Sequence, residues 1–195
     1  NTLQTICDGD AITGIAVSNE ATHAGTPDFD ISIVNITGDK SDLTATGNAL
    51  NEPSGQAYPY TIAGTLTNNT DDAITIQYRI TPKLAGCADG AVVTANVTIE
   101  PTPKAALTNT LQTICDGDAI TGIAVSNEAT HAGAPSFDIT IANITGDKAD
   151  LTATGNALDE PAGQAYPYTI SGTLTNNTDD AITIQYRITP KLAGC

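Results

Sequence analysis

The stretch AITIQYRIT occupies residues 73–81 and recurs unchanged at 181–189. Its apolar side chains fall on every second position: Ile74, Ile76, Tyr78 and Ile80. This period is typical of a β strand with one buried face. Further alternating runs begin at Phe29, Tyr58 and Val93. Because no stretch shows a convincing apolar stripe at helical spacing, the sequence predicts an all-β chain.

The sequence also repeats itself. Residues 1–87 align with 109–195 without a gap, at an offset of 109 − 1 = 108. The two copies differ at eight positions: Thr26/Ala134, Asp28/Ser136, Ser32/Thr140, Val34/Ala142, Ser41/Ala149, Asn51/Asp159, Ser54/Ala162 and Ala63/Ser171. All but Val34/Ala142 involve small or polar residues, as expected on solvent-facing positions. The pattern indicates a window from a longer tandem array, with a natural two-repeat protein as the alternative.

Each copy reads as an immunoglobulin-like antiparallel β-sandwich, because short strands alternate with turn-forming residues. We expect two such sandwiches stacked end to end: repeat 1 at 1–101, a short proline-containing linker at 102–108 and repeat 2 at 109–195. The strand expected at 91–99 has no counterpart in repeat 2, which leaves an open edge there. The following residues of an array would supply that strand, and a strand donated by another subunit is the alternative.

The charge and hydropathy of the chain exclude two classes of partner. The 195 residues carry a formal net charge of −15, with 7 Lys and Arg against 22 Asp and Glu. A generic nucleic-acid binder needs basic residues to neutralise phosphates, so we expect no nucleic-acid partner. No apolar run approaches the ~20 residues that cross a bilayer, so we expect no membrane span in this segment.

The four cysteines are spaced identically in the two copies. Cys7 and Cys87 are 87 − 7 = 80 positions apart, and so are Cys115 and Cys195. Four cysteines allow three pairings. Pairing Cys7 with Cys87 and Cys115 with Cys195 gives each repeat one bridge and is the preferred prediction, with a Cys87–Cys115 bond as the alternative. A zinc site is disfavoured because no C-x-x-C pair is present. Disulfides imply an oxidising, extracellular compartment.

Acidic turns and N-x-T sequons supply the remaining candidate sites. Calcium takes six to eight oxygen ligands, and the candidates are Asp8, Asp10, Asp39, Asp42, Asp116, Asp118, Asp147 and Asp150. Asp-Gly pairs also form ordinary turns, so solvated acidic loops are the preferred interpretation and a calcium site is the alternative. We expect no other cofactor. The candidate glycan acceptors are Asn35, Asn68, Asn96, Asn143 and Asn176. A sequence rich in Thr and Asn produces such sequons by chance.

No catalytic set is indicated, and we expect the protein not to be an enzyme. His23 and His131 occupy the same position in the two copies, in a loop expected to be exposed, and no Ser/His/Asp triad accompanies them. Glu20 and Glu52 do not suggest a glycosidase pair, because a narrow sandwich with few aromatic residues offers no cleft.

Two further groups have structural readings. Tyr58, Tyr60 and Tyr78 could form a stacking platform for sugars, but they share a strand face with aliphatic residues, which favours core packing. Lys40, Lys83 and Lys104 are candidates for an isopeptide cross-link to Asn or Asp. A disulfide would already serve the same mechanical purpose, which disfavours this cross-link.

The order of motifs is itself characteristic. QTICDGDAITGI near the start is followed by GTLTNNTDDAITIQYRITPKLAGCADGAVVTANVTIEPTP. This resembles the tandem PKD-like repeats of very large secreted proteins of the Bacteroidota, including surface adhesins associated with gliding motility and exported by type IX secretion. The matching elements are Cys7, residues 66–70, 78–82, 86–87 and 101–103. The resemblance implies the sandwich fold and a cell-surface location, and it implies no catalytic residue.

The expected function is therefore structural. Stacked repeats would form an extended stalk or filament of a cell-surface adhesin, which holds a binding region away from the cell. The expected partners are neighbouring repeats of the same chain, while other regions would meet surface glycans or other cells. The alternatives are a carbohydrate- or surface-binding module of an exported protein and a subunit of a laterally assembled extracellular filament.

Overall fold

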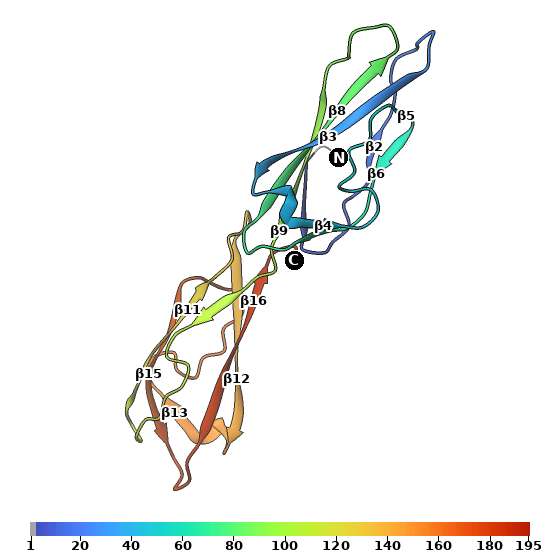
Figure 1. The fold of residues 1–195 in the computed structure, drawn as a ribbon. Coiled ribbons are helices and arrows are strands. Elements are labelled where there is room, and N and C mark those ends of the chain that lie inside the picture. Colours follow the sequence, from blue (N-terminus) through green and yellow to red (C-terminus); the bar gives the residue numbers. More distant parts are fainter. Residues whose placement is uncertain (1–2) are drawn as a thin grey trace. The chain divides into compact units, whose positions relative to one another are not determined.

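A computed structural model describes residues 3–195, which divide into two compact units. The first comprises the chain up to Thr102 together with Thr130–Ala132 and Gly194, and the second comprises the rest. Apart from one short 3-10 helix each, the regular elements of both units are β strands (Figure 1). The predicted all-β class with immunoglobulin-like sandwiches is confirmed.

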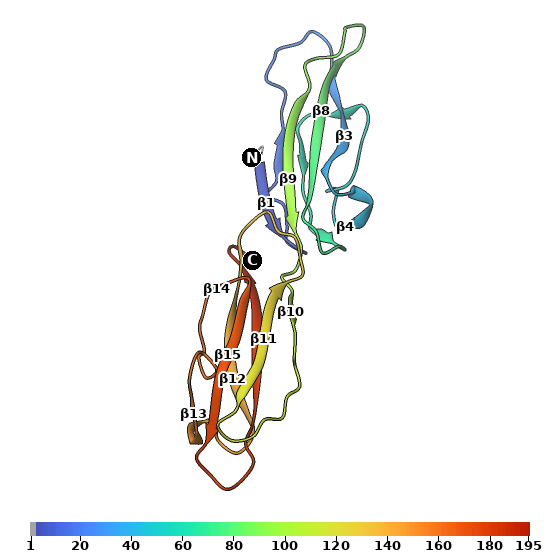
Figure 2. The same ribbon diagram turned by 90° about the vertical axis from the view of Figure 1, so that its left-hand side faces the viewer.

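The first unit contains two layers of strands. Its elements are β1 (Leu3–Cys7), β2 (Ile15–Val17), β3 (Pro27–Thr37), η1 (Lys40–Asp42), β4 (Leu43–Ala45), β5 (Gln56–Ala57), β6 (Tyr60–Ile62), β7 (Leu66–Asn68), β8 (Ile74–Leu84) and β9 (Val93–Glu100). One sheet has the order β1-β9-β8-β3-β5, and the strand pairs β2–β6 and β4–β7 form the facing layer. β1 runs parallel to β9, whereas β8 runs antiparallel to both β9 and β3 (Figure 2).

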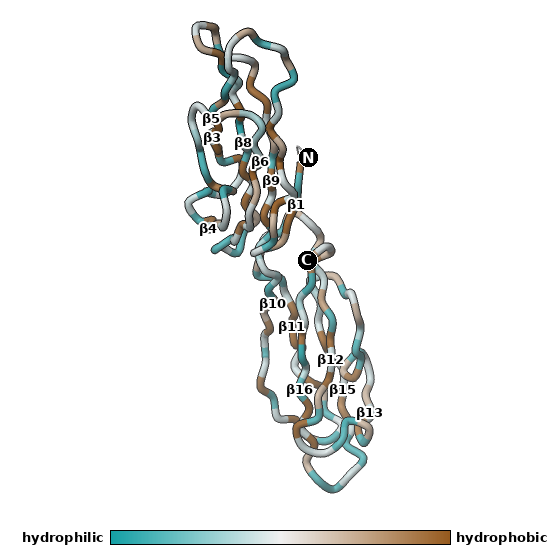
Figure 3. Tube along the Cα trace, turned by 90° about the vertical axis from the view of Figure 1, so that its right-hand side faces the viewer, coloured by the Kyte–Doolittle hydropathy of each residue, from teal (hydrophilic) through white to brown (hydrophobic). Residues whose placement is uncertain are grey.

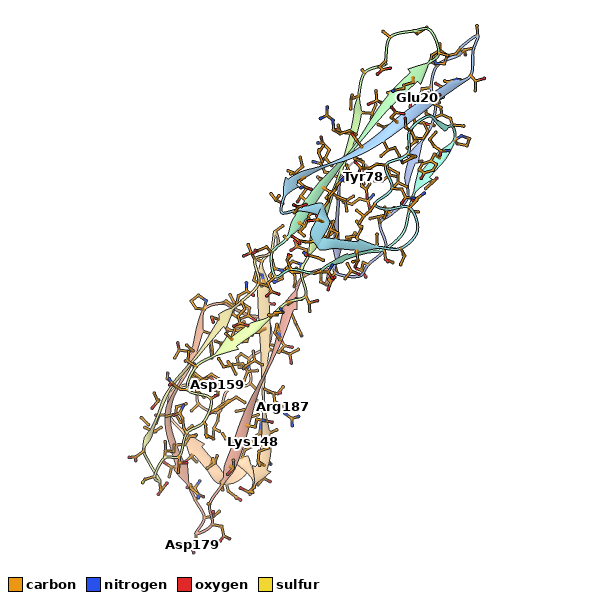
Figure 4. The ribbon with its side chains drawn as sticks, viewed as in Figure 1. Glu20, Tyr78, Lys148, Asp159, Asp179 and Arg187 are labelled. Carbon is orange, nitrogen blue, oxygen red and sulfur yellow. The ribbon has the colours of Figure 1, made fainter. Side chains whose placement is uncertain are left out.

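The alternation in the sequence explains the core of this unit. Every second side chain of β3 and β8 points between the two layers, so Phe29 and Tyr78 are both 0% exposed. Tyr78 lies near the middle of the unit, and its hydroxyl donates a hydrogen bond of 2.7 Å to the Ala49 carbonyl (Figure 4). The pairing of β3 with β8 extends from Pro27 opposite Leu84 to a bulge near the other end.

The second unit repeats this plan with fewer strands in one sheet. Its elements are β10 (Ala105–Leu107), β11 (Ala119–Asn127), β12 (Pro135–Thr145), η2 (Lys148–Asp150), β13 (Leu151–Ala153), β14 (Gln164–Ala165), β15 (Tyr168–Asn176) and β16 (Thr183–Leu192). The sheets have the orders β14-β12-β16 and β10-β11-β15-β13. β10 lies within residues 102–108, where the sequence predicted only a linker, because Ala105–Leu107 pairs antiparallel with β11.

The two cores differ although their sequences hardly do. Hydrophobic residues recur along the strands of the first unit (Figure 3). This unit buries residues of both layers in one apolar cluster: Ile12, Ile15, Val17, Phe29, Ile31, Ile33, Leu43, Ala49, Ile62, Leu66, Ile74, Ile76, Tyr78, Ile80, Ala95, Val97 and Ile99. The corresponding buried cluster of the second unit contains only Ile123, Val125, Phe137, Ile139 and Ile170. The second core is therefore closed around Phe137 and more open along β16.

Candidate functional site

The cysteines of the first unit lie at opposite ends of its larger sheet. β1 ends at Cys7, level with the start of β8 at Ile74, because β9 pairs with both strands. Cys87 lies beyond the other end of β8, where its N–H donates to the Leu84 carbonyl. Ten residues along a strand cover ~33 Å, whereas a disulfide needs Cα atoms within ~7 Å. The predicted Cys7–Cys87 bridge is therefore wrong.

The second unit contradicts the matching prediction. Cys115 is followed by Asp116, whose Oδ1 accepts the N–H of Asn176 at the end of β15 and so lies near the start of β16. Cys195 follows the far end of that strand, so the predicted Cys115–Cys195 bridge is wrong for the same reason. Cys87 and Cys115 carry free, exposed thiols, which also excludes the alternative Cys87–Cys115 bond. Cys7 and Cys195 are disulfide-bonded, so oxidised cysteine is confirmed for these two residues.

The acidic calcium candidates hold turns in place. Asp8 accepts the N–H of Asn68 at 2.8 Å. Asp39 accepts the N–H of Ser41 at 2.9 Å and caps η1, and hydrogen bonds of this kind lower the pKa of Asp39 below its ordinary range. In the second unit, Asp147 repeats this role on η2.

The other acidic candidates act through their backbones or repeat these contacts. Asp10, Asp42, Asp118 and Asp150 each accept a backbone N–H at their carbonyl oxygen. Asp116 repeats the role of Asp8. Across residues 3–195, no group of three or more His, Cys, Asp or Glu side chains lies close enough together to hold a metal ion. The structure thus assigns these residues to turns and does not bring them into one calcium site.

One sequon is incompatible with a glycan. Asn68 is 5% exposed, and its Nδ2 donates to the carbonyls of Asp72 at 2.8 Å and Ile99 at 3.2 Å. A buried amide with both hydrogens engaged has no room for a sugar, so the prediction at Asn68 is wrong. The remaining sequons, at Asn35, Asn96, Asn143 and Asn176, stay predictions.

The two equivalent histidines have different surroundings. His23 is exposed, as predicted. The His131 side chain is 0% exposed, and its Nδ1 lies 3.4 Å from Oε2 of the buried Glu100. The same carboxylate oxygen accepts the N–H of Ala132 at 3.0 Å. The expected exposure of His131 is therefore wrong, because Thr130–Ala132 packs into the first unit.

The tyrosines pack in the core as predicted. The ring centroids of Tyr58 and Tyr60 lie 4.7 Å and 5.8 Å from that of Phe29. Tyr78 is fully enclosed, and this burial raises the pKa of its hydroxyl. Aromatic rings used in this way do not present a flat row for sugar stacking.

Two of the isopeptide candidates are engaged in ion pairs. The Lys40 Nζ lies 2.6 Å from one oxygen of Glu52, whose other oxygen accepts the Ile33 N–H at 2.6 Å. The Lys83 Nζ lies 2.5 Å from the carboxylate of Asp30. Both pairs are partly exposed, so their net contribution to stability is small. The Lys40 pair holds η1 and the loop at Glu52 against β3, whereas the Lys83 pair joins β8 to β3.

Replacing Lys83 with alanine is expected to raise the pKa of Asp30 from about 2 toward its ordinary value of 3.8, because the Lys83 hydrogen bond is the largest cause of the depression. A carboxyl with a lowered folded-state pKa stabilises the fold above its unfolded pKa of ~3.9. That contribution is lost as the pH falls through the folded value of about 2. Carboxyl-carbon NMR titration of the wild-type and variant chains measures the shift.

A matched control comes from the second hydrogen bond to the same carboxylate. Ser54 Oγ donates to Asp30 at 2.7 Å, and the second repeat has Ala162 at this position. Ser54→Ala should therefore raise the Asp30 pKa less than Lys83→Ala does. An Asp30 titration that is the same in wild type and Lys83→Ala would contradict the assigned cause.

The most unusual surface of the second unit is the outer edge of β16. β16 pairs with β12 on one side, from Pro135 opposite Leu192 along nearly its whole length. Within the described residues, no strand pairs with its other side. Unpaired strand edges expose backbone N–H and C=O groups that can pair with another strand.

No helix in residues 3–195 is long and apolar enough to cross a membrane. No family model matches the sequence, and no curated protein matches it either.

Several solved structures align with the chain at low similarity. They include CBD12 from CALX1.2, at 13% identity and a TM-score of 0.35, covering 98% of this chain and 79% of that one. The D0-D1 domain of intimin aligns at 15% identity and a TM-score of 0.29, covering 95% and 87%. The CsuC–CsuE chaperone–tip adhesion subunit complex of Acinetobacter baumannii aligns at 7% identity and a TM-score of 0.35, covering 97% and 95%.

Proposed function

We propose that the chain is a structural repeat segment of an extended cell-surface adhesin stalk or filament, which spaces a binding region from the cell. The proposal rests on the repetition in the chain. Two nearly identical sequences, with eight differences in 87 aligned positions, form the same type of sandwich. Each copy has its own apolar core. Repeated units with self-contained cores are suited to building length.

The chemistry of the chain supports an extracellular setting for this proposal. Cys7 and Cys195 are disulfide-bonded, and disulfides persist in oxidising compartments. The resemblance to Bacteroidota adhesin repeats adds cell-surface display, gliding motility and type IX secretion to the proposal. Its partners are neighbouring repeats, and contact with glycans or other cells is assigned to other regions of such a protein.

In this proposal the segment is structural rather than catalytic, and its negative surface charge keeps neighbouring stalks apart. Most of the acidic calcium candidates cap or support turns, and the tyrosines pack in or against the core. A net charge of −15 makes neighbouring stalks repel one another, an effect that salt screens within about 10 Å at 0.1 M. The packed tyrosines also give no support to the alternative of a carbohydrate-binding module.

Small-angle X-ray scattering of the chain, with electron microscopy of the native protein, tests the proposal. A single compact globule of this length has a radius of gyration of ~16 Å. We expect a clearly larger value, unchanged at high salt, and threads one domain wide in micrographs. A value near that of a globule would contradict an extended segment. A thick, helically ordered fibre would contradict the lone stalk and favour lateral assembly.

A further inference from the structure

A short segment covers the outer edge of β3. β3 pairs with β8 on one side, and residues 52–57 (the first strap) lie along its other side. The Pro53 carbonyl accepts the N–H of Ile31 at 2.9 Å. The end of the strap, Gln56–Ala57, forms β5 by pairing with the start of β3. The first strap therefore takes the place that a neighbouring strand would occupy.

At Ile33 the first strap covers the edge with a side chain instead of its backbone. One carboxylate oxygen of Glu52 accepts the Ile33 N–H at 2.6 Å. Lys40 donates to the Ile33 carbonyl at 3.2 Å and to the other oxygen of Glu52 at 2.6 Å. Both backbone groups through which Ile33 could pair with another strand are thus occupied. Unlike a backbone carbonyl, a carboxylate can be neutralised by a proton.

The second unit covers the edge of β12 in the same way, with residues 160–165 (the second strap). Ile139 donates its N–H to the Pro161 carbonyl at 2.9 Å. Ile141 donates to one oxygen of Glu160 at 2.6 Å, and Lys148 binds the other oxygen. The arrangement is therefore a property of the repeat and does not depend on one local contact.

The two straps differ where Ser54 of the first repeat is replaced by Ala162 in the second. In the first unit, the Asp30 carboxylate accepts the Ser54 hydroxyl at 2.7 Å and the Gly55 N–H at 2.8 Å. In the second unit, the equivalent Asp138 accepts the N–H of Gly163 at 2.8 Å, and the methyl group of Ala162 adds no hydrogen bond. The edge of β12 should therefore be uncovered more readily than the edge of β3.

The charged groups around the second strap leave Glu160 with one basic partner. Lys148 of η2 faces Glu160, and Asp159 precedes Glu160 in the chain. Asp147 caps η2, and Asp138 of β12 is paired with Lys191 of β16. The strap is thus held at Ile141 by a carboxylate whose charge is balanced by Lys148.

This balance makes the strap sensitive to acid. The hydrogen bond from Lys148, together with that from Ile141, lowers the pKa of Glu160 below its ordinary value of 4.5. A carboxylate with a lowered folded-state pKa stabilises the fold above its unfolded pKa. That contribution is lost as the pH falls through the folded value, because a neutral carboxyl accepts weaker hydrogen bonds and no longer attracts Lys148.

Acid also removes the repulsion between copies of the chain. The net charge is −15 at pH 7, and the isoelectric point is about 4.1. Copies therefore repel one another at neutral pH and lose most of that repulsion near pH 4. Release of the strap and loss of repulsion both follow acidification.

We propose that the edge of β12 is an acid-gated site of self-association, which pairs with the β12 edge of a second copy of this chain once the second strap is released. A second copy fits because two identical edges related by a twofold axis are self-complementary. In antiparallel pairing, each copy offers the backbone groups of Ile139 and Ile141 that the strap had covered. The loss of like charge near the isoelectric point favours the same partner. This inference does not rest on the proposed adhesin function.

Sedimentation velocity of the full chain tests the proposal. The wild type should associate at least about tenfold more tightly at about pH 3.5 than at pH 7, and it should dissociate when the pH is restored. Glu160→Gln places a neutral side chain of the same shape on the strap, so it should associate at least about tenfold more tightly than the wild type at pH 7. The Glu160 side chain is 36% exposed, so this substitution removes no core packing.

Matched variants locate the site on the second strap. Ala162→Ser restores the hydroxyl that the first strap has and should weaken the acid-induced association about fivefold, the effect of one hydrogen bond. Glu52→Gln, on the more firmly held first strap, should promote association about fivefold less than Glu160→Gln does. Amide exchange followed by NMR should slow in β12 of the associated chains.

Three results would overturn the proposal. In the first, Glu160→Gln and Glu160→Ala, which removes the acceptor altogether, both fold and associate no more than the wild type at pH 7. In the second, high salt alone at pH 7 produces the association, which would mean that screening of charge suffices while the strap stays closed. In the third, the amides protected in the associated chains lie on β16 and not on β12.

Discussion

Replacing Phe29 with alanine is expected to lower the free energy of unfolding of the first unit by about 3–5 kcal/mol. Phe29 is 0% exposed, and the rings of Tyr58 and Tyr60 pack against it at centroid distances of 4.7 Å and 5.8 Å. Both tyrosines are held by β6 and the turn before it, so they cannot collapse into the space that the ring leaves. The loss therefore combines transfer of the ring with an unfilled cavity.

The second repeat provides the matched experiment. Phe137 is also 0% exposed, with Tyr166 and Tyr168 at the same centroid distances of 4.7 Å and 5.8 Å. Phe137→Ala should therefore destabilise the second unit by a similar amount. Chemical denaturation followed by NMR signals of each unit measures both losses separately. A loss below about 1 kcal/mol for either variant would mean that the surrounding rings do close the cavity.

Much of the fold could be predicted because local pattern and repetition agree. Alternation in residues 29–33 and 74–80 marks strands with one buried face, and the structure buries that face in β3 and β8. The gap-free alignment of the two copies predicts the same fold twice. Such predictions depend only on the order of residues within one segment of the chain, which the sequence gives directly.

The disulfide pairing could not be obtained in this way. Equal spacing of Cys7–Cys87 and Cys115–Cys195 says how many residues separate them, and nothing about which end of a sheet each one reaches. That depends on β1 running parallel to β9 and on β9 running antiparallel to β8. Strand order is a long-range property, so a spacing rule applied within one repeat failed.

The sequence also could not predict that segments with identical sequences are buried to different degrees. His23 is exposed and the side chain of His131 is buried, although each stands in the same Ala-Thr-His-Ala-Gly motif. Ile76 is fully buried, while Ile184 in an identical strand is not. In both cases the deciding factor is a neighbour from elsewhere in the chain, such as Glu100 for His131 and β9 for Ile76.

Gly64→Ala is expected to destabilise the first unit by about 2–6 kcal/mol, through two effects that add. Gly64 has φ of 139°, a region that L side chains rarely adopt and that costs about 1–3 kcal/mol in strain. A Cβ atom there would also fall on the carbonyl oxygen of Thr46, which belongs to the backbone and cannot rotate away. Relieving such an overlap by backbone shifts costs about 1–3 kcal/mol more.

A second glycine separates strain from overlap. Gly9 also has a positive φ, of 80°, but a Cβ there meets nothing within 4 Å. Gly9→Ala should therefore cost only the backbone strain, about 1–2 kcal/mol. Thermal and urea unfolding of the wild type and both variants gives the two losses, and Gly172→Ala repeats the overlap in the second unit, where the Thr154 carbonyl stands in the way. Equal losses for Gly64→Ala and Gly9→Ala would show that the segment around Thr46 moves aside. A clearly larger loss for Gly64→Ala would show that the segment around Thr46, whose N–H donates to the Thr65 carbonyl at 3.1 Å, does not move aside.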